Sequence, residues 1–238
     1  MWGVLPESAR LVKPLHLVLA VLASALVAAG PAYADPESLN PDAFDLSGAL
    51  DRPVPPTQPS FEVALGGGYT QGVGGAGTTG NVQDLTGPGG TVELQLAYRR
   101  DARFSTGVYG TLAWFQHGDA IADGSRTYGA TAGVQAAWHA TENRSLDPWI
   151  GVGVGWRGLW VTHGDARPSS MHGIELLRVQ TGIDYRITPR LAVAPVVAMS
   201  LSIFLVENAV MPEFTSVEDK RLNLYGFAGF LGRFDVGP

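Results

Sequence analysis

The chain has 238 residues, of which 16% are charged and 31 are glycine, and its formal net charge is −6. The acidic balance argues against a nucleic-acid partner, which would need a basic face, and the absence of cysteine excludes disulfides and thiolate metal sites. Ordinary soluble domains contain about 25% charged residues, so the low charge and abundant glycine favour a chain with two differently solvated surfaces.

The first 34 residues have the pattern of a secretory signal peptide. Arg10 and Lys13 precede the apolar run LHLVLAVLASALVAAG (15–30), and the small-residue motif AYA ends at Ala34. An uncleaved anchor is the alternative, but the run is shorter than the roughly 20 residues of a membrane-spanning helix. We therefore expect residues 1–34 to direct export and to be removed.

Residues 35–59 are acidic, rich in proline and without a sustained period. This composition is typical of segments that bury too little apolar surface to fold. We predict a disordered periplasmic leader over 35–59, with a partner-binding peptide as the alternative.

From residue 60 onward, apolar and aromatic residues alternate with small, polar or charged ones, which predicts β-strands with two different faces. Eight segments show this pattern: 61–69, 92–99, 103–114, 127–138, 150–157, 177–186, 191–203 and 222–234. Their connections are alternately long (71–90, 117–126, 162–172 and 206–220) and shorter, with tight turns at 100–102 and 188–189 and a medium turn at 140–148. This is the arrangement of an up-and-down barrel that spans a membrane, with short periplasmic turns and long outer loops.

Aromatic residues on the apolar faces fall at two levels. The level near the short connections holds Phe61, Tyr98, Phe104, Trp138, Tyr185 and Phe234, and the level near the long connections holds Tyr69, Trp114, Tyr128 and Trp156. Phe104 and Trp114 are ten residues apart, as are Tyr128 and Trp138. At about 3.3 Å per residue and a tilt of about 40°, ten residues span roughly 25 Å, the height of the apolar band of an outer-membrane barrel. We interpret the two levels as aromatic belts at the lipid–water interfaces.

The opposite faces carry charged residues, namely Glu62, Glu93, Arg157, Arg178, Asp184 and Arg186. An eight-stranded barrel is narrow enough for side chains to fill it, so we expect these residues to form a polar network in the barrel interior. A narrow conduit for small solutes is the alternative use of the same interior. A soluble, lipocalin-like barrel would reverse the two faces, and an apolar-ligand pocket would then be lined by Trp114, Trp138, Trp156 and Tyr185.

Residues 191–206 are almost continuously apolar and include Pro195. We predict a strand in which a bulge accommodates the proline, because proline removes a donor from the hydrogen-bond ladder. A helix is the alternative, although it would be short for a membrane span.

Two HGDA motifs follow the third and fifth predicted strands. Their side chains His117, Asp119, His163 and Asp165 could bind a divalent cation such as Zn²⁺, but Gly-Asp is also ordinary turn chemistry. We therefore name them only as weak candidates and predict no metal and no cofactor. The sequence has no His-x-Ser-Asn cluster and no phosphate-binding loop, so we also predict no enzymatic activity.

The stretch GIDYRITPR (182–190), the proline-interrupted strand after it and the closing sequence GFLGRFDV (229–236) resemble the small outer-membrane β-barrel domains of Gram-negative bacteria. This class includes proteins similar to the transmembrane domain of outer-membrane protein A and to the W-type porin. The resemblance covers residues 60–236 and implies insertion into the outer membrane by the barrel assembly machinery, without enzymatic activity.

These patterns predict an all-β protein, an eight-stranded antiparallel up-and-down transmembrane β-barrel over residues 60–236 in the outer membrane of a Gram-negative bacterium. We expect a monomer in contact with outer-membrane lipid, with its leader and short turns in the periplasm. The predicted role is structural, or a surface interaction through the outer loops with an unidentified ligand.

Overall fold

The computed structural model describes residues 59–237, except 78–79, 119–120, 122–123, 142–144, 163–168 and 209–214. The predicted signal peptide (1–34) and residues 35–58 of the predicted leader lie outside the described residues. None of the described helices has the length and apolar character of a membrane-spanning helix.

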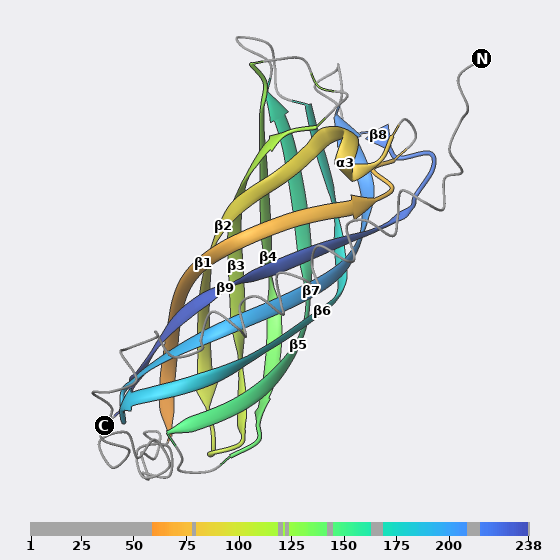
Figure 1. Ribbon diagram of the computed structural model, residues 1–238. Coiled ribbons are helices and arrows are strands. Elements are labelled where there is room, and N and C mark those ends of the chain that lie inside the picture. The colour runs from red at the N-terminus through yellow and green to blue at the C-terminus, as the bar shows by residue number, and fades with distance from the viewer. Residues whose placement is uncertain are drawn as a thin grey trace, which may run out of the picture. The chain divides into compact units, whose positions relative to one another are not determined.

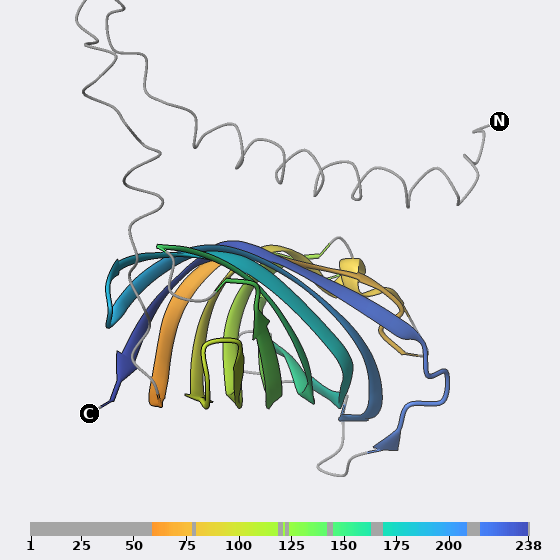
Figure 2. The same ribbon diagram turned by 90° about the horizontal axis from the view of Figure 1, so that it is seen from below.

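Eight long strands form the body of the described structure (Figure 1). In chain order they are β1 (Ser60–Gly74), β2 (Thr86–Arg99), β3 (Phe104–His117), β4 (Arg126–His139), β5 (Leu146–Thr162), β6 (Ser169–Thr188), β7 (Leu191–Asn208) and β9 (Leu222–Val236). Consecutive long strands pair antiparallel, and β9 also pairs with β1, so the sheet closes on itself. Figure 2 shows the strands curving as one continuous sheet. The predicted all-β, eight-stranded antiparallel barrel is confirmed.

Two short elements lie in the long connections. The helix α3 (Val82–Leu85) lies between β1 and β2, and the two-residue strand β8 (Thr215–Ser216) pairs with the end of β7. Both lie at the end of the barrel opposite the C-terminal residues (Figure 1). We call this the long-connection end and the other the short-connection end.

The alternation of side chains along each strand decides what the two faces of the barrel carry. In β1, Phe61 and Leu65 are 64% and 63% exposed, whereas Glu62 and Ala64 are buried. The same period-2 pattern runs through β2, where Val92, Leu94 and Leu96 are exposed and Glu93 and Gln95 are buried. Along these strands the outer face is therefore apolar and the inner face largely polar, the reverse of a soluble barrel.

Side chains close two of the short connections by bonds to the backbone. Asp101 Oδ1 accepts hydrogen bonds from the backbone N–H groups of Arg103 and Phe104, both at 2.9 Å. Thr188 Oγ1 accepts from those of Arg190 at 3.2 Å and Leu191 at 3.0 Å. Asp and Thr favour turns through such bonds, so the residues at these positions explain why the hairpins are tight.

Pro195 lies inside β7 without a bulge. Val193 pairs with Tyr185 and Val196 pairs with Gly182, so the register against β6 is the same on both sides of the proline. Pairing with β6 is interrupted at Ala194 and Pro195, whereas both residues stay paired with β9. The predicted bulge is therefore wrong, because the chain omits two pairings instead of inserting a residue, and the helical alternative for 191–206 is excluded.

A bulge does occur in β6, at Leu176. The register of β6 shifts by one residue there against both β5 and β7. Leu176 and Leu177 consequently both face outward, while Glu175 and Arg178 both face the interior. The predicted start of this strand at residue 177 is therefore wrong, because the bulge interrupts the alternation there and the strand in fact begins at Ser169.

Candidate functional site

The barrel interior at the short-connection end holds a set of buried charges that we call the lower cluster. Its members come from β1, β2, β4, β5, β6 and β9 and are Glu62, Arg99, His139, Asp147, Asp184 and Arg233. Arg99 Nε donates to Glu62 Oε1 at 2.5 Å, and His139 Nδ1 lies 2.7 Å from Asp147 Oδ2. Arg233 Nη1 lies 3.4 Å from Asp184 Oδ2, while the other oxygen of Asp184 accepts from Trp149 Nε1 at 2.9 Å. The lower cluster thus ties together six of the strands.

Arg186 forms a neighbouring ion pair in the same part of the interior. Its Nη1 donates to Asp235 Oδ2 at 2.8 Å, and both side chains are about 1% exposed. The pair joins β6 to β9, so it adds a link beside the lower cluster.

A second set of charges, the central cluster, fills the middle of the interior and consists of Glu93, Tyr109, Arg157, Glu175 and Arg178. Arg178 Nη2 donates to Glu93 Oε2 and Arg157 Nη2 donates to Glu175 Oε1, both at 2.7 Å. Tyr109 OH donates to the other oxygen of Glu175 at 2.5 Å. Both buried arginines therefore have a carboxylate partner, which buried charges require.

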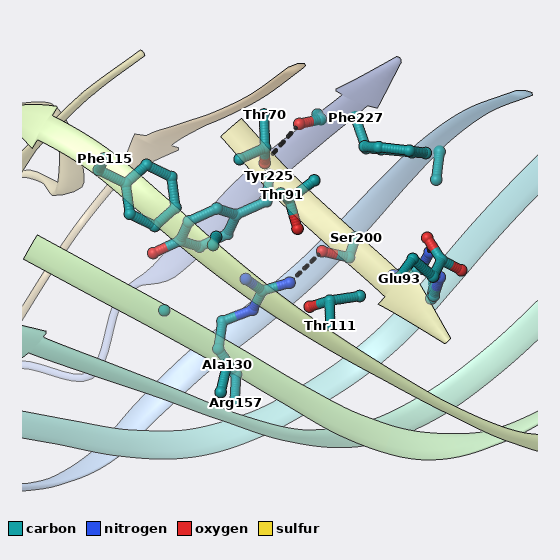
Figure 3. Close-up of a pocket in the computed structure, with 15 residues that line it drawn as sticks. Thr70, Thr91, Glu93, Thr111, Phe115, Ala130, Arg157, Ser200, Tyr225 and Phe227 are labelled. Carbon is teal, nitrogen blue, oxygen red and sulfur yellow. Dashed lines mark hydrogen bonds and ion pairs between the residues drawn. The ribbon is translucent and has the colours of Figure 1, made fainter. Parts of the chain in front are cut away.

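Aromatic rings and hydroxyl groups complete the surroundings of these arginines. The Arg157 guanidinium carbon lies 3.9 Å from the ring centre of Tyr225, and Arg157 Nη2 donates to Ser200 Oγ at 2.7 Å (Figure 3). The Arg178 guanidinium carbon lies 4.7 Å from the ring centre of Tyr109. Such cation–π contacts become stronger where water is excluded, so both arginines are held in place by several groups.

Small cavities lie between the described side chains of the lower and central clusters. One cavity of about 30 Å³ is lined in part by Arg157, Arg178 and Tyr225 (Figure 3), and another of about 10 Å³ by Glu62, Gln95 and Arg233. Cavities of this size have room for only one or two water molecules. Side chains therefore fill the lumen at the lower and central clusters.

The interior at the long-connection end is apolar. We call its cluster the apolar plug, and it comprises Ala76, Val82, Leu85, Ala113, Phe115, Leu159, Met171, Phe204, Val217 and Tyr225. Thr86 Oγ1 donates to the Val82 carbonyl at 2.9 Å, and Thr127 Oγ1 of β4 donates to the Leu85 carbonyl at 3.1 Å. These bonds hold α3 inside the mouth of the barrel.

The sequence did not predict this plug, because residues 71–90 have the composition of a glycine-rich connection. A signal was present in the Asn81-Val-Gln-Asp84 stretch, in which Asp84 Oδ2 accepts the Asn81 backbone N–H at 2.7 Å. An Asn followed three residues later by an acidic residue is a variant of the capping box that starts helices. The segment is short, so its apolar residues could not be assigned to a helix by periodicity.

The structure places the predicted interior residues in the lumen: Glu62, Glu93, Arg157, Arg178, Asp184 and Arg186 are all buried. Among the described ion pairs, only Glu93–Arg178 joins two of these six. The other partners, which sequence analysis did not single out, are Arg99, Glu175, Arg233 and Asp235. The alternation could have identified Arg99, which lies on the same face as Glu93, whereas the bulge at Leu176 concealed Glu175.

The predicted belt aromatics all lie on the outer surface, where Tyr69, Tyr98, Trp114, Trp138, Trp156, Tyr185 and Phe234 are exposed and Tyr128 is half-buried. Trp114, Trp138, Trp156 and Tyr185 therefore do not line an interior pocket, which overturns the lipocalin-like alternative. Trp156 also packs against two rings that the sequence did not associate with it. Its ring centre lies 5.9 Å from that of Trp160 and 5.6 Å from that of His172.

The weak metal candidates are described only in part. His117 ends β3 and is exposed, whereas Asp119, His163 and Asp165 lie outside the described residues. Within the described ranges, one group of possible ligands comes together, His139, Asp147 and Asp184. Arginine Nη atoms already lie 3.0 Å from His139 Nε2 and 3.4 Å from Asp184 Oδ2, so positive charge occupies the place that a metal ion would take.

Comparison with known proteins supports the fold. No family model matches the chain, and no curated protein matches its sequence. The crystal structure of Neisserial surface protein A matches with a TM-score of 0.51 and 15% identity, covering 73% of this chain and 96% of that one. The outer-membrane protein OprG of Pseudomonas aeruginosa matches with a TM-score of 0.42 and 11% identity, covering 74% of this chain and 97% of that one. The attachment invasion locus protein Ail of Yersinia pestis matches with a TM-score of 0.39 and 13% identity, covering 75% of this chain and 100% of that one. The match to Neisserial surface protein A confirms, at the level of the fold, the resemblance to small outer-membrane barrels.

Proposed function

We propose that the protein is a β-barrel of the bacterial outer membrane whose lumen is closed to solutes and whose outward end carries its function. The observation that supports this most is that the barrel has an apolar outer face and charged groups on its inner face, the reverse of a soluble barrel. Large apolar side chains are exposed on all eight long strands, while the described ion pairs of the lower and central clusters are buried inside.

An apolar outer surface of this extent favours a lipid environment. The largest apolar patch on a typical soluble monomer covers about 300–600 Å², whereas here apolar residues such as Leu94, Val108, Val134 and Val152 follow one another around the barrel. A closed barrel also pairs the backbone groups of every strand, which a protein within hydrocarbon requires. Outer-membrane lipid is therefore the proposed partner of this surface.

The lengths of the connections support one orientation. Barrels of this class keep short turns in the periplasm and long loops outside the cell. We place residues 100–103 and 189–190 in the periplasm, and α3 and β8 at the cell surface. The barrel assembly machinery would then insert the exported chain, which would function as a monomer.

The filled interior favours a structural or surface-interaction role over a small-solute conduit. An ion that entered from outside would have to displace the apolar plug and then separate Arg178 from Glu93. In planar lipid bilayers we expect no conductance steps from the purified full chain. Steady single-channel currents would overturn the closed-lumen part of the proposal.

Localisation is tested separately in cells that express the full chain. We expect the protein in the outer-membrane fraction, with faster gel migration before boiling than after, as closed barrels show. Protease added to intact cells should cut within 71–90 and 206–220 but not at 188–190. Recovery in the soluble periplasm, or cleavage at 188–190 in intact cells, would overturn the proposed placement.

A further inference from the structure

A cavity of about 280 Å³ lies at the long-connection end, beside the apolar plug. Its walls come from α3 and the residues before it, and from the ends of β5, β6 and β7. No described residue of the lower or central cluster lines it. It is therefore a separate space at the mouth of the barrel, about ten times larger than the lumen cavity of about 30 Å³.

The floor of this cavity is apolar. Leu85, Leu159 and Met171 belong to the apolar plug, and Val161 continues the same face of β5. Leu159 and Val161 are only 2% and 5% exposed, so packing holds them in place. Removing an apolar group from water onto such a floor is favourable.

The rim of the cavity is acidic. It carries Asp84 of α3 and Glu207 of β7, and no lysine or arginine is among the described residues that line it. Asp84 uses Oδ2 to accept from Asn81, which leaves Oδ1 available. Neither carboxylate takes part in an ion pair within the described ranges of the chain.

We propose that this cavity binds a small organic cation with an apolar body and an ammonium group. The body would lie on Leu159, Val161 and Met171, and the ammonium would donate hydrogen bonds to Glu207 and Asp84. Charge-assisted bonds of this kind are about twice as strong as neutral ones. The proposal rests on the proposed function, because the ligand must reach the long-connection end from outside the cell.

The size of the cavity sets the size of the ligand. A cavity of about 150 Å³ is sufficient for benzene, so 280 Å³ has room for one aromatic ring and a short charged arm. A suitable probe is 2-phenylethylammonium. Two compounds of similar shape serve as controls, namely neutral 2-phenylethanol and anionic 3-phenylpropionate.

The experiment is isothermal titration calorimetry on the full chain in nanodiscs of zwitterionic lipid, with the signal of empty nanodiscs subtracted. We expect saturable binding of 2-phenylethylammonium at one site. The alcohol and the carboxylate should bind about tenfold more weakly or not at all, because they cannot donate a charged hydrogen bond to the rim. Equal affinity for all three compounds, or no saturable binding by a correctly folded barrel, would overturn the proposal.

Variants locate the binding. Glu207→Gln should weaken binding of the ammonium about tenfold, and Val161→Phe should abolish it by filling the cavity. Glu218→Gln is the matched control for charge, since Glu218 is exposed at the same end of the barrel, and Val154→Phe is the control for size, since Val154 faces outward from the same strand. Unchanged affinity in both Glu207→Gln and Val161→Phe would show that the ligand binds elsewhere.

A failure of the cation-binding inference is distinguishable from a failure of the proposed function. A barrel that fractionates with the outer membrane and conducts no current, yet does not bind the cation, removes only this inference. A barrel that conducts, or that is recovered as a soluble protein, removes the proposed function whatever the calorimetry shows.

Discussion

The position of a buried side chain in this barrel depends on the small residues beside it as well as on its charged partners. Tyr109 can donate to Glu175 from the middle of the lumen because glycines leave room beside its ring. A Cβ atom added to Gly133 or Gly155 would lie 2.6 or 2.8 Å from the Tyr109 hydroxyl oxygen, closer than real contacts allow. The charge of Glu175 is thus positioned by glycines on two neighbouring strands.

The Glu93–Arg178 ion pair allows a test at this scale. Arg178→Met should lower the free energy of unfolding by about 3–5 kcal/mol, because it leaves the Glu93 carboxylate buried without its partner. Adding Glu93→Gln to that variant should restore part of the loss, since the remaining group is neutral. Urea unfolding in lipid vesicles measures both effects, and Arg190→Met, at an exposed turn position, is the control. If the double variant loses as much free energy of unfolding as the two single variants lose together, the two side chains do not interact directly.

At the scale of the elements, irregularities decide which side chains reach the interior. The bulge at Leu176 lets Glu175 and Arg178, three residues apart, share the lumen. The helix α3 adds Val82 and Leu85 to the apolar plug, most of which consists of inward-facing strand residues such as Phe115 and Leu159. Neither feature follows from a regular strand pattern.

Deletion of Leu176 tests the bulge. Without the extra residue, Glu175 and Arg178 are two positions apart, so a regular strand turns both side chains toward the lumen. We therefore expect the deletion variant to keep heat-modifiable migration on gels, as Leu176→Val should. A deletion variant that loses this migration would show that closure of the barrel needs the bulge itself and not only the inward orientation of the two charges.

The variant Val82→Asp tests the apolar plug. Val82 is fully buried in α3, so a carboxylate there should release residues 75–85 while the barrel below stays folded. Hydrogen exchange should increase in that segment, and bilayer recordings should stay silent because the central cluster still fills the lumen. Gln83→Asp, at a partly exposed position of the same helix, should leave the exchange unchanged. A current through the Val82→Asp protein would show that the plug alone closes the lumen.

At the scale of the whole molecule, closure of the sheet creates one continuous surface with two aromatic levels. Trp138 of β4 pairs with Phe104 and Ile150, and Tyr128 pairs with Trp114 and Trp160. Aromatic residues of adjacent strands therefore meet at matching heights, as expected for a barrel that contacts lipid between two interfaces. The apolar band between the levels is a property of the assembled sheet and not of any one strand.

The depth dependence of a charge on this surface provides the corresponding test. Val134→Arg should destabilise the barrel by about 2–4 kcal/mol in lipid vesicles, because Val134 faces outward on β4 between Tyr128 and Trp138, which belong to the two aromatic levels. Val236→Arg, at the end of β9, should cost about 0–1 kcal/mol. Urea unfolding of both variants measures the difference. Equal effects of the two substitutions would contradict the placement of the bilayer.

Sequence alone determined the number of long strands, their antiparallel order and the face that each regular segment turns outward. It could do so because alternation and turn chemistry are local properties, readable over a few residues. Only the tertiary structure decided the ion-pair partners such as Arg99 with Glu62, the bulge at Leu176 and the burial of Val82 beneath the mouth of the barrel. These depend on which strands become neighbours when the sheet closes and on the space left inside it, and neither is encoded within a single segment of the chain.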